Sequence, residues 1–312
     1  MIRELSIIIP VYNSEEILDN LTNKLIQTLK KKYNNFEIIL INDASKDNSW
    51  KIVQKLCKKN KLIKGINLRK NVGQHNAIFA GLENCDGKII VTMDDDGQNL
   101  PESIPILVEK LNKGFDVCYA NYKDKKHNFF RKFGSFINNL VASILFDKPF
   151  NLVLTGFRCF TSDIKNEILN YRSKYIYLDG IIFSYTNNYS QIYVDHKERK
   201  IGKSNYTTSK LLSLWLRMTF GFSIIPLRLA SIFGILLSFT SLIITIWLIF
   251  FREMSSLIPL GWTSLMVIIL FLGGIQLLAL GLIGEYLGRT YITINNSTKY
   301  SIKNKINFLD KI

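Results

Sequence analysis

The chain has 312 residues, 47% of them hydrophobic, and a formal net charge of +15. This length allows roughly two domains, and the mean hydropathy of +0.11 is too high for a purely soluble protein. The charge would attract nucleic acid, anionic lipid or phosphorylated substrates, but a nucleic-acid binder usually interleaves aromatic residues with its basic patch on a soluble fold, which argues against that partner. The cysteines lack the paired spacing of a disulfide framework or a zinc site and are expected to be small buried residues: Cys57, Cys85, Cys118 and Cys159.

Strands and helices are predicted to alternate along the N-terminal part of the chain. Short apolar runs at 5–11, 36–41, 63–68 and 89–93 predict buried strands. Between them apolar residues recur at helical spacing, as in the stripe of Ile17, Leu18, Leu21, Leu25 and Leu29. This alternation predicts an α/β fold with a parallel, doubly wound sheet and right-handed crossovers.

Polar residues follow the predicted strands. Tyr12, Asp43 and the cluster at 94–98 should therefore line one edge of the sheet, where open α/β sheets bind nucleotides. Asn13 and Glu16 have the spacing of a capping box for the first helix. The fingerprints GxGxxG and GxxxxGK[ST] do not occur in the sequence, so neither a classical dinucleotide site nor a P-loop is predicted.

The acidic cluster after the fourth predicted strand contains Asp94, Asp95 and Asp96, with Gln98 close behind. Carboxylates packed this closely repel one another and need a cation, and all-oxygen ligands favour Mg²⁺ or Mn²⁺ over zinc or copper. The cluster alone leaves a second interpretation open, in which acidic residues complement the dipole of a helix that starts at 100–102.

Two long uncharged stretches follow in the C-terminal part of the chain. Residues 229–251 and 257–284 contain no charged side chain, and each exceeds the ~20 apolar residues that cross a bilayer. They predict a two-helix transmembrane hairpin within 227–288. A buried soluble hairpin is disfavoured because neither stretch has a polar face to show to water.

Basic residues on both sides of the hairpin predict its orientation. Arg217 and Arg228 precede the first span, whereas Arg289, Lys299 and other lysines follow the second, so both termini are expected in the cytoplasm. The N-terminus has no secretory leader pattern. The expected layout is a cytoplasmic domain at 1–208, an aromatic and basic interfacial segment at 209–226, the hairpin, and a basic cytoplasmic tail at 289–312.

An ordered set of short motifs carries a resemblance that spans nearly the whole chain. The set resembles family-2 glycosyltransferases of the GT-A type, and specifically the polyprenyl-phosphate glycosyltransferases, the group that includes dolichyl-phosphate mannose synthase and bacterial bactoprenol glucosyltransferases. The matching segments are Ile9-Pro10-Val11-Tyr12-Asn13 with Glu15, Asn42-Asp43-Ala44-Ser45-Lys46-Asp47, Leu68-Arg69-Lys70-Asn71-Val72-Gly73, Met93-Asp94-Asp95-Asp96 with Gln98, Thr155-Gly156-Phe157-Arg158, Gly202-Lys203-Ser204 with Tyr206, Pro226-Leu227-Arg228-Leu229 and Gly284-Glu285-Tyr286-Leu287-Gly288-Arg289.

The resemblance implies a GT-A catalytic domain, Rossmann-like with a mostly parallel sheet, anchored in the cytoplasmic membrane. It implies an inverting, metal-dependent hexosyltransferase that moves a sugar from a nucleotide sugar to polyprenyl phosphate, such as undecaprenyl or dolichyl phosphate, for a cell-surface glycan or glycolipid. A UDP-sugar is favoured because a buried carboxylate at Asp43 suits the ring N–H of uracil, although guanine could also donate to it. The protein is expected to bind the membrane and is compatible with a homo-oligomer.

The resemblance also implies roles for individual positions. It implies a nucleoside site made of Pro10, Tyr12, Glu15 and Asp43. It places Asp94 and Asp96 at the diphosphate, adds Asp94 and Asp95 to the nucleotide-sugar site, and puts a metal on Asp96, Gln98 and Asp94, with Asp94 and Asp96 as the catalytic residues. It implies acceptor and diphosphate binding by Arg131, Ser135, Arg199 and Lys203.

The sequence departs from the family pattern at several positions. Gly97 replaces a usual leucine, and Tyr122 stands about where many members carry arginine. Residues 297–300, Ser-Thr-Lys-Tyr, replace a common Arg-Pro-x-Tyr motif.

The expected chemistry agrees with these residue types. Departure of a nucleoside diphosphate develops negative charge, which a divalent ion stabilises directly. A lipid phosphate is already anionic near neutral pH, so it can attack the anomeric carbon without a strong general base.

Two other functions are less compatible with the sequence. A processive polysaccharide synthase-like enzyme, acting on a carbohydrate or another lipid, usually has more spans and a Gln-x-x-Arg-Trp motif, which this sequence lacks. A non-catalytic membrane scaffold would leave the three aspartates and Asp43 without a role.

Overall fold

The structure is a computed structural model that describes residues 3–122, 149, 152–173, 176–195, 261–294 and 298–308, together with single positions between 232 and 243. The chain divides into two compact units. The first comprises Met1–Tyr206 and Ser297–Ile312, and the second comprises Thr207–Asn296.

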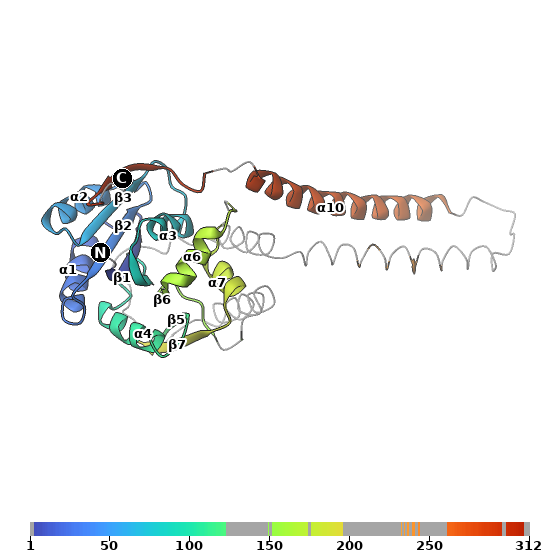
Figure 1. The fold of residues 1–312 in the computed structure, drawn as a ribbon. Coiled ribbons are helices and arrows are strands. Elements are labelled where there is room, and N and C mark those ends of the chain that lie inside the picture. Colours follow the sequence, from blue (N-terminus) through green and yellow to red (C-terminus); the bar gives the residue numbers. More distant parts are fainter. Residues whose placement is uncertain are drawn as a thin grey trace, which may run out of the picture. The chain divides into compact units, whose positions relative to one another are not determined.

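The first unit is built on one mixed sheet. Across the described residues it has eight strands in the order β7-β5-β6-β4-β1-β2-β3-β8 (Figure 1). The strands are β1 (Arg3–Val11), β2 (Phe36–Asn42), β3 (Ile63–Leu68), β4 (Gly87–Thr92), β5 (Val117–Tyr122), β6 (Arg158–Thr161), β7 (Tyr189–Val194) and β8 (Ile302–Ile306). The four predicted strands are its centre and run parallel, which confirms the predicted α/β class.

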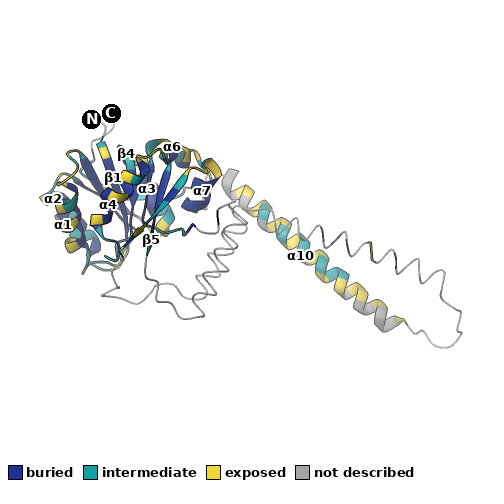
Figure 2. Cartoon of the chain, turned by 90° about the horizontal axis from the view of Figure 1, so that it is seen from below, coloured by how far each residue is buried: buried dark blue, intermediate teal, exposed yellow. Residues whose placement is uncertain are grey.

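Helices cover both faces of this sheet. They are α1 (Leu18–Leu29), α2 (Ser49–Lys59), α3 (Gln74–Glu83), α4 (Ile104–Leu111), which follows the short 3₁₀ helix η1 (Pro101–Ser103), α6 (Ser162–Asn170) and α7 (Leu178–Tyr185). Leu5, Ile7 and Ile9 of β1 face the core that α1, α2 and α4 share. Ile8 faces the opposite side, where Gly81 of α3 packs against it so closely that a Cβ would lie 2.6 Å from the Ile8 side chain. The strands are largely buried between these layers, as Figure 2 shows, because each face of a parallel sheet must be covered.

The predicted capping box is wrong. Helix α1 begins at Leu18 and has no side-chain cap, because Asn13 lies in a left-handed turn with φ of 54° and accepts a hydrogen bond from the Lys46 backbone N–H instead. The residues predicted as a basic tail at 289–312 also belong in part to folded elements. Ile302–Ile306 is strand β8, which pairs antiparallel with β3 at the edge of the sheet.

The second unit contains α10 (Trp262–Ile294). Within the described residues it is the helix long and apolar enough to cross a membrane by length and composition, with a mean hydropathy of 1.4 over Phe271–Gly288. It begins after the predicted start of the second span and continues beyond the predicted end at 284, because the backbone stays helical through Glu285 and Arg289. The first predicted span lies largely outside the described residues, and the interfacial segment at 209–226 lies wholly outside them.

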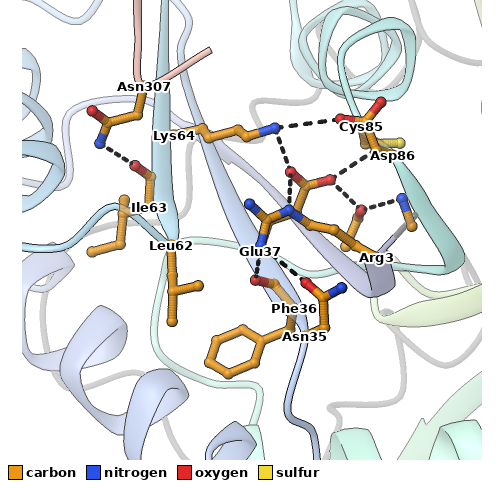
Figure 3. Close-up of polar contacts among 12 residues, drawn as sticks. Arg3, Asn35, Phe36, Glu37, Leu62, Ile63, Lys64, Cys85, Asp86 and Asn307 are labelled. Carbon is orange, nitrogen blue, oxygen red and sulfur yellow. Dashed lines mark hydrogen bonds and ion pairs between the residues drawn. The ribbon is translucent and has the colours of Figure 1, made fainter. Parts of the chain in front are cut away.

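A buried ion network joins the starts of four strands (Figure 3). The carboxylate of Glu37 is fully buried, and it accepts hydrogen bonds from the Ser6 hydroxyl at 2.6 Å and the Asp86 backbone N–H at 2.8 Å. The ammonium of Lys64 lies 2.6 Å from it and Nε of Arg3 lies 3.4 Å from it. The charge of Glu37 is therefore compensated within the protein at the amino ends of the strands.

We expect Glu37→Gln to destabilise the first unit, because it leaves the buried Lys64 ammonium without its close carboxylate partner. Removing one partner of a buried pair costs on the order of 3 kcal/mol. Thermal unfolding of the purified protein should show a lower midpoint for this variant. Glu4→Gln, an exposed position on the same sheet, is the matched control and should unfold as the wild type does. Equal midpoints for both variants would contradict this account of the network.

Candidate active site

The carboxyl ends of β4, β1 and β2 meet at one edge of the sheet. Parallel pairing continues past the strand ends, since the Asp43 N–H donates to the Val11 carbonyl at 2.9 Å and the Met93 N–H donates to the Ile8 carbonyl at 3.2 Å. Tyr12, Asp43 and the acidic cluster therefore lie along the same edge, as the sequence predicted.

Asp43 is held by the start of α3. Its two carboxylate oxygens accept backbone hydrogen bonds from Val72 at 2.8 Å and Gly73 at 2.9 Å. Burial raises the pKa of Asp43, while these two amides act in the opposite direction. Gly73 has φ of 85° and ψ of 159°, a conformation that a side chain would strain, so glycine is required where the loop turns toward the carboxylate.

Asp94 is held by Gln74, the residue that follows Gly73. The Gln74 side-chain amide donates to Asp94 Oδ1 at 2.6 Å. On the other side, a Cβ on Gly156 would lie 2.9 Å from the same oxygen, so the absence of a side chain at 156 leaves room for the carboxylate. Burial, followed by the charges of Asp96 and Asp95, raises the pKa of Asp94 to about 6.

Asp95 ties the acidic cluster to the loop after β1. Its Oδ2 accepts hydrogen bonds from the Tyr12 backbone N–H at 2.9 Å and from the Ser14 hydroxyl. The Tyr12 side chain itself is 36% exposed at the edge of the sheet. Glu15 lies in the same loop, where its carboxylate accepts the Asn48 N–H at 2.8 Å. The loops after β1, β2 and β4 are thus cross-linked by side chains.

The remaining members of the acidic cluster form a tight turn. The Gln98 backbone N–H donates to Asp96 Oδ1 at 3.1 Å, and Gly97 between them has φ of 70°. The Tyr122 hydroxyl, at the position where arginine is common in the resembling family, donates to Asn99 Oδ1 at 2.7 Å and so supports this turn.

The donor set at this edge is suited to a hard divalent cation. Three consecutive carboxylates and a nearby amide supply oxygen ligands, and burial followed by the neighbouring carboxylates raises the pKa of Asp94. No group of three His, Cys, Asp or Glu side chains arranged as a complete metal site occurs in the part of the chain that the structure describes.

A buried ion pair beside Asp94 was missed from the sequence. Arg158 of β6 is 1% exposed, lies opposite Thr92 of β4, and forms an ion pair with Asp179 of α7. The Tyr119 hydroxyl donates to the same Asp179 oxygen at 3.1 Å. Arg158 occurs in a short strand that contains no other charged residue, so only the motif around Gly156 could have drawn attention to it.

The other predicted site residues divide into two groups. Pro10 is buried within β1, paired with Ile41 of β2. The predicted acceptor and diphosphate residues lie outside the described residues: Arg131, Ser135, Arg199 and Lys203.

The half-buried His75 adjoins the site on α3. Its Nδ1 accepts the Leu178 backbone N–H at 3.4 Å, and its ring packs edge-on against Tyr177 at 5.2 Å. Burial, followed by the positive charge of Arg158, lowers the pKa of His75 to about 3. The folded protein therefore keeps this imidazole neutral.

We expect His75 to make the protein less stable in mild acid. Below pH 6.5 the unfolded chain takes up a proton at His75 while the folded chain does not, so the contribution to stability is complete above pH 6.5 and declines as the pH falls toward 3. His75→Asn keeps an acceptor for the Leu178 N–H but cannot titrate. Between pH 7.5 and pH 5, the loss of stability should be smaller for this variant than for the wild type by about 2 kcal/mol, because pH 5 lies well below the pKa of the unfolded imidazole. Equal losses of stability in His75→Asn and in the wild type would contradict the lowered pKa of His75.

The first unit resembles solved glycosyltransferase structures in fold. Glucosyl-3-phosphoglycerate synthase from Mycobacterium tuberculosis, solved in complex with Mn²⁺, UDP and phosphoglyceric acid, superposes with a TM-score of 0.51. The match has 14% sequence identity and covers 69% of this chain and 78% of that chain. It supports the predicted GT-A fold.

Comparison of sequences gives a closer relationship. An undecaprenyl-phosphate 4-deoxy-4-formamido-L-arabinose transferase of Proteus mirabilis is 30% identical over 305 residues, covering 97% of this chain and 94% of the relative. An uncharacterized glycosyltransferase of Synechocystis sp. is 32% identical, covering 96% of this chain and 94% of the relative. The description of Glycosyl transferase family 2 matches residues 6–170, from β1 to the end of α6, and so includes the whole acidic edge of the sheet. The chain belongs to glycosyl transferase family 2.

Proposed function

We propose that the protein is a membrane-bound inverting glycosyltransferase that moves a sugar from a nucleotide sugar, preferably a UDP-sugar, to polyprenyl phosphate. The observation that carries the proposal is the length of the match to undecaprenyl-phosphate transferases. It covers 97% of this chain, so it continues beyond the family segment at residues 6–170 through the apolar C-terminal part and includes the region that would meet a lipid acceptor.

The nucleoside would bind along the loops after β1 and β2. The exposed Tyr12 ring offers a face for the base, Glu15 lies in the same loop, and Pro10 lies in β1 just before it. Asp43 has backbone donors on both oxygens, yet each oxygen keeps a second lone pair with which to accept the ring N–H of uracil.

The diphosphate would bind beside the acidic cluster. Asp94, Asp96 and Gln98 would hold Mg²⁺ or Mn²⁺ there, with Asp95 fixing the cluster to the β1 loop. A divalent ion so bound would neutralise the charge that develops on the departing diphosphate. The Gln74 side-chain amide positions the Asp94 carboxylate, and the absence of a side chain at Gly156 leaves room for it.

The acceptor phosphate would be bound by Arg131, Ser135, Arg199 and Lys203. A phosphate oxygen is anionic near neutral pH and can attack the anomeric carbon without a protein base. Attack opposite the leaving diphosphate inverts that carbon. We assign the protein to the cell membrane, with the catalytic unit and both termini in the cytoplasm.

Transfer and its dependence on the acidic cluster can be tested together. The purified protein, given radiolabelled UDP-sugars, undecaprenyl phosphate and Mg²⁺ or Mn²⁺, should form a sugar-phospholipid. Asp96→Asn should lower the rate by roughly 100-fold or more, and chelation should have the same effect on the wild type. Asp163→Asn, an exposed aspartate at the start of α6, is the control. A lipid product formed at full rate by Asp96→Asn in chelator, or sugar transfer only to carbohydrate, would contradict the proposal.

The proposed topology can be tested by cysteine labelling. The four native cysteines are buried, so a membrane-impermeant maleimide should label only introduced ones. Ser223→Cys and Thr298→Cys should react only from the cytoplasmic side, whereas Ser255→Cys should react only from the outside. Reaction of the first two from opposite sides would remove one span from the proposed hairpin.

A further inference from the structure

The chain returns to the catalytic unit after α10 and binds to it over a continuous stretch. We call residues 299–306, which include β8, the C-terminal strap. Lys305 and Asn304 pair with Ile66 and Asn67 of β3, and the Ser301 carbonyl accepts the Arg69 N–H at 2.8 Å. The strap is the dark red strand beside β3 in Figure 1.

Three side chains of the strap bind the carboxyl end of α3 or its surroundings. The Lys299 ammonium lies 3.7 Å from the centre of the Phe79 ring and also donates to the Tyr171 carbonyl. The Tyr300 hydroxyl donates to the Glu83 carboxylate, and Lys305 donates to Asn84 Oδ1 at 2.6 Å. Burial lowers the pKa of Lys299, as expected for an ammonium enclosed by these groups.

The opposite end of α3 holds the candidate donor site. Gly73 and Val72 bind Asp43, and Gln74, the first residue of the helix, binds Asp94. Between these two ends α3 packs closely on the sheet, since a Cβ on Gly81 would lie 2.6 Å from the Ile8 side chain and 3.0 Å from the Ile41 side chain. A short, regular helix moves as a unit, so a shift at its carboxyl end also shifts the residues that hold the two aspartates.

We propose that Lys299 and Tyr300 are positioning residues for the nucleotide donor. They fix α3 from its far end, and α3 in turn fixes Asp43 and Asp94. Donor binding thereby depends on the segment that directly follows the apolar helix α10 in the chain. This inference rests on the proposed function, which places the donor at the two aspartates.

A purely structural role for the strap gives a different expectation. The backbone pairing of β8 covers the edge of β3 and would do so with almost any side chain at 299. If edge protection were the whole role, Lys299→Gln would affect overall stability at most, and donor binding would not change.

The experiment uses the full-length protein in detergent and compares two identical substitutions in the strap. Lys299→Gln removes the cation above Phe79, whereas Lys303→Gln changes an exposed lysine of β8. We expect Lys299→Gln to weaken binding of UDP with Mg²⁺, measured by calorimetry, by roughly five- to tenfold. The KM for the nucleotide sugar should rise with it, while the KM for polyprenyl phosphate should not. Tyr300→Phe should also weaken UDP binding. Lys299→Arg keeps the positive charge and should bind UDP nearly as well as the wild type, and Lys303→Gln should match the wild type.

Hydrogen exchange gives a readout that needs no ligand. In Lys299→Gln, the amides of Val72 and Gly73, which donate to Asp43, should exchange faster than in the wild type and in Lys303→Gln. Unchanged exchange at these amides, or unchanged UDP affinity beside a wild type that binds UDP, would overturn the inference. A wild type that binds neither UDP nor GDP would instead contradict the proposed function, and the exchange comparison would still decide whether the strap positions α3.

Discussion

The candidate site depends on one short segment that holds carboxylates from two different strands. Val72, Gly73 and Gln74 are consecutive, and between them they donate three hydrogen bonds to Asp43 and Asp94. Carboxylates gathered at one edge of a sheet repel one another, and burial adds a further cost to their charge. Donors fixed at the start of a helix that is itself packed on the sheet compensate part of this cost. They also determine where the negative charge is concentrated, which is what a site for a cation and a diphosphate requires.

Buried charge is compensated at the amino ends of the strands, whereas negative charge accumulates at their carboxyl ends. At the amino ends of the strands, the buried Glu37 has Lys64 and Arg3 as close partners, so its charge is compensated by the protein. At the carboxyl ends, burial raises the pKa of Asp94, and the neighbouring carboxylates of Asp96 and Asp95 raise it further. A compensated network stabilises the fold, whereas an excess of one sign at an accessible edge is suited to binding. The amino ends of the strands therefore contribute to stability, whereas their carboxyl ends form the candidate binding site.

The sequence allowed prediction of the central strands and of the site edge, because both depend on local patterns. Four apolar runs of strand length gave β1 to β4, and the polar residues that follow them lie together because parallel strands end at the same edge. The partners that support the site could not be predicted in this way. Arg158 meets Asp179 and Tyr119 through antiparallel pairing of β6 between β4 and β5, a non-local arrangement that no periodicity records. Asn13 failed as a helix cap for a similar reason, since its side chain binds the loop after β2.

The C-terminal strand shows why a linear division into domains is insufficient for this chain. Its residues alternate poorly, carry several lysines and follow a long apolar helix, all of which suggest a tail. Their pairing partner, β3, precedes them by most of the length of the chain, so the interaction leaves no local trace. The consequence is that the catalytic unit is completed only after the apolar region has been synthesised. Cutting the chain after its N-terminal domain would therefore remove the strand that pairs with the edge of β3 and contacts the far end of α3.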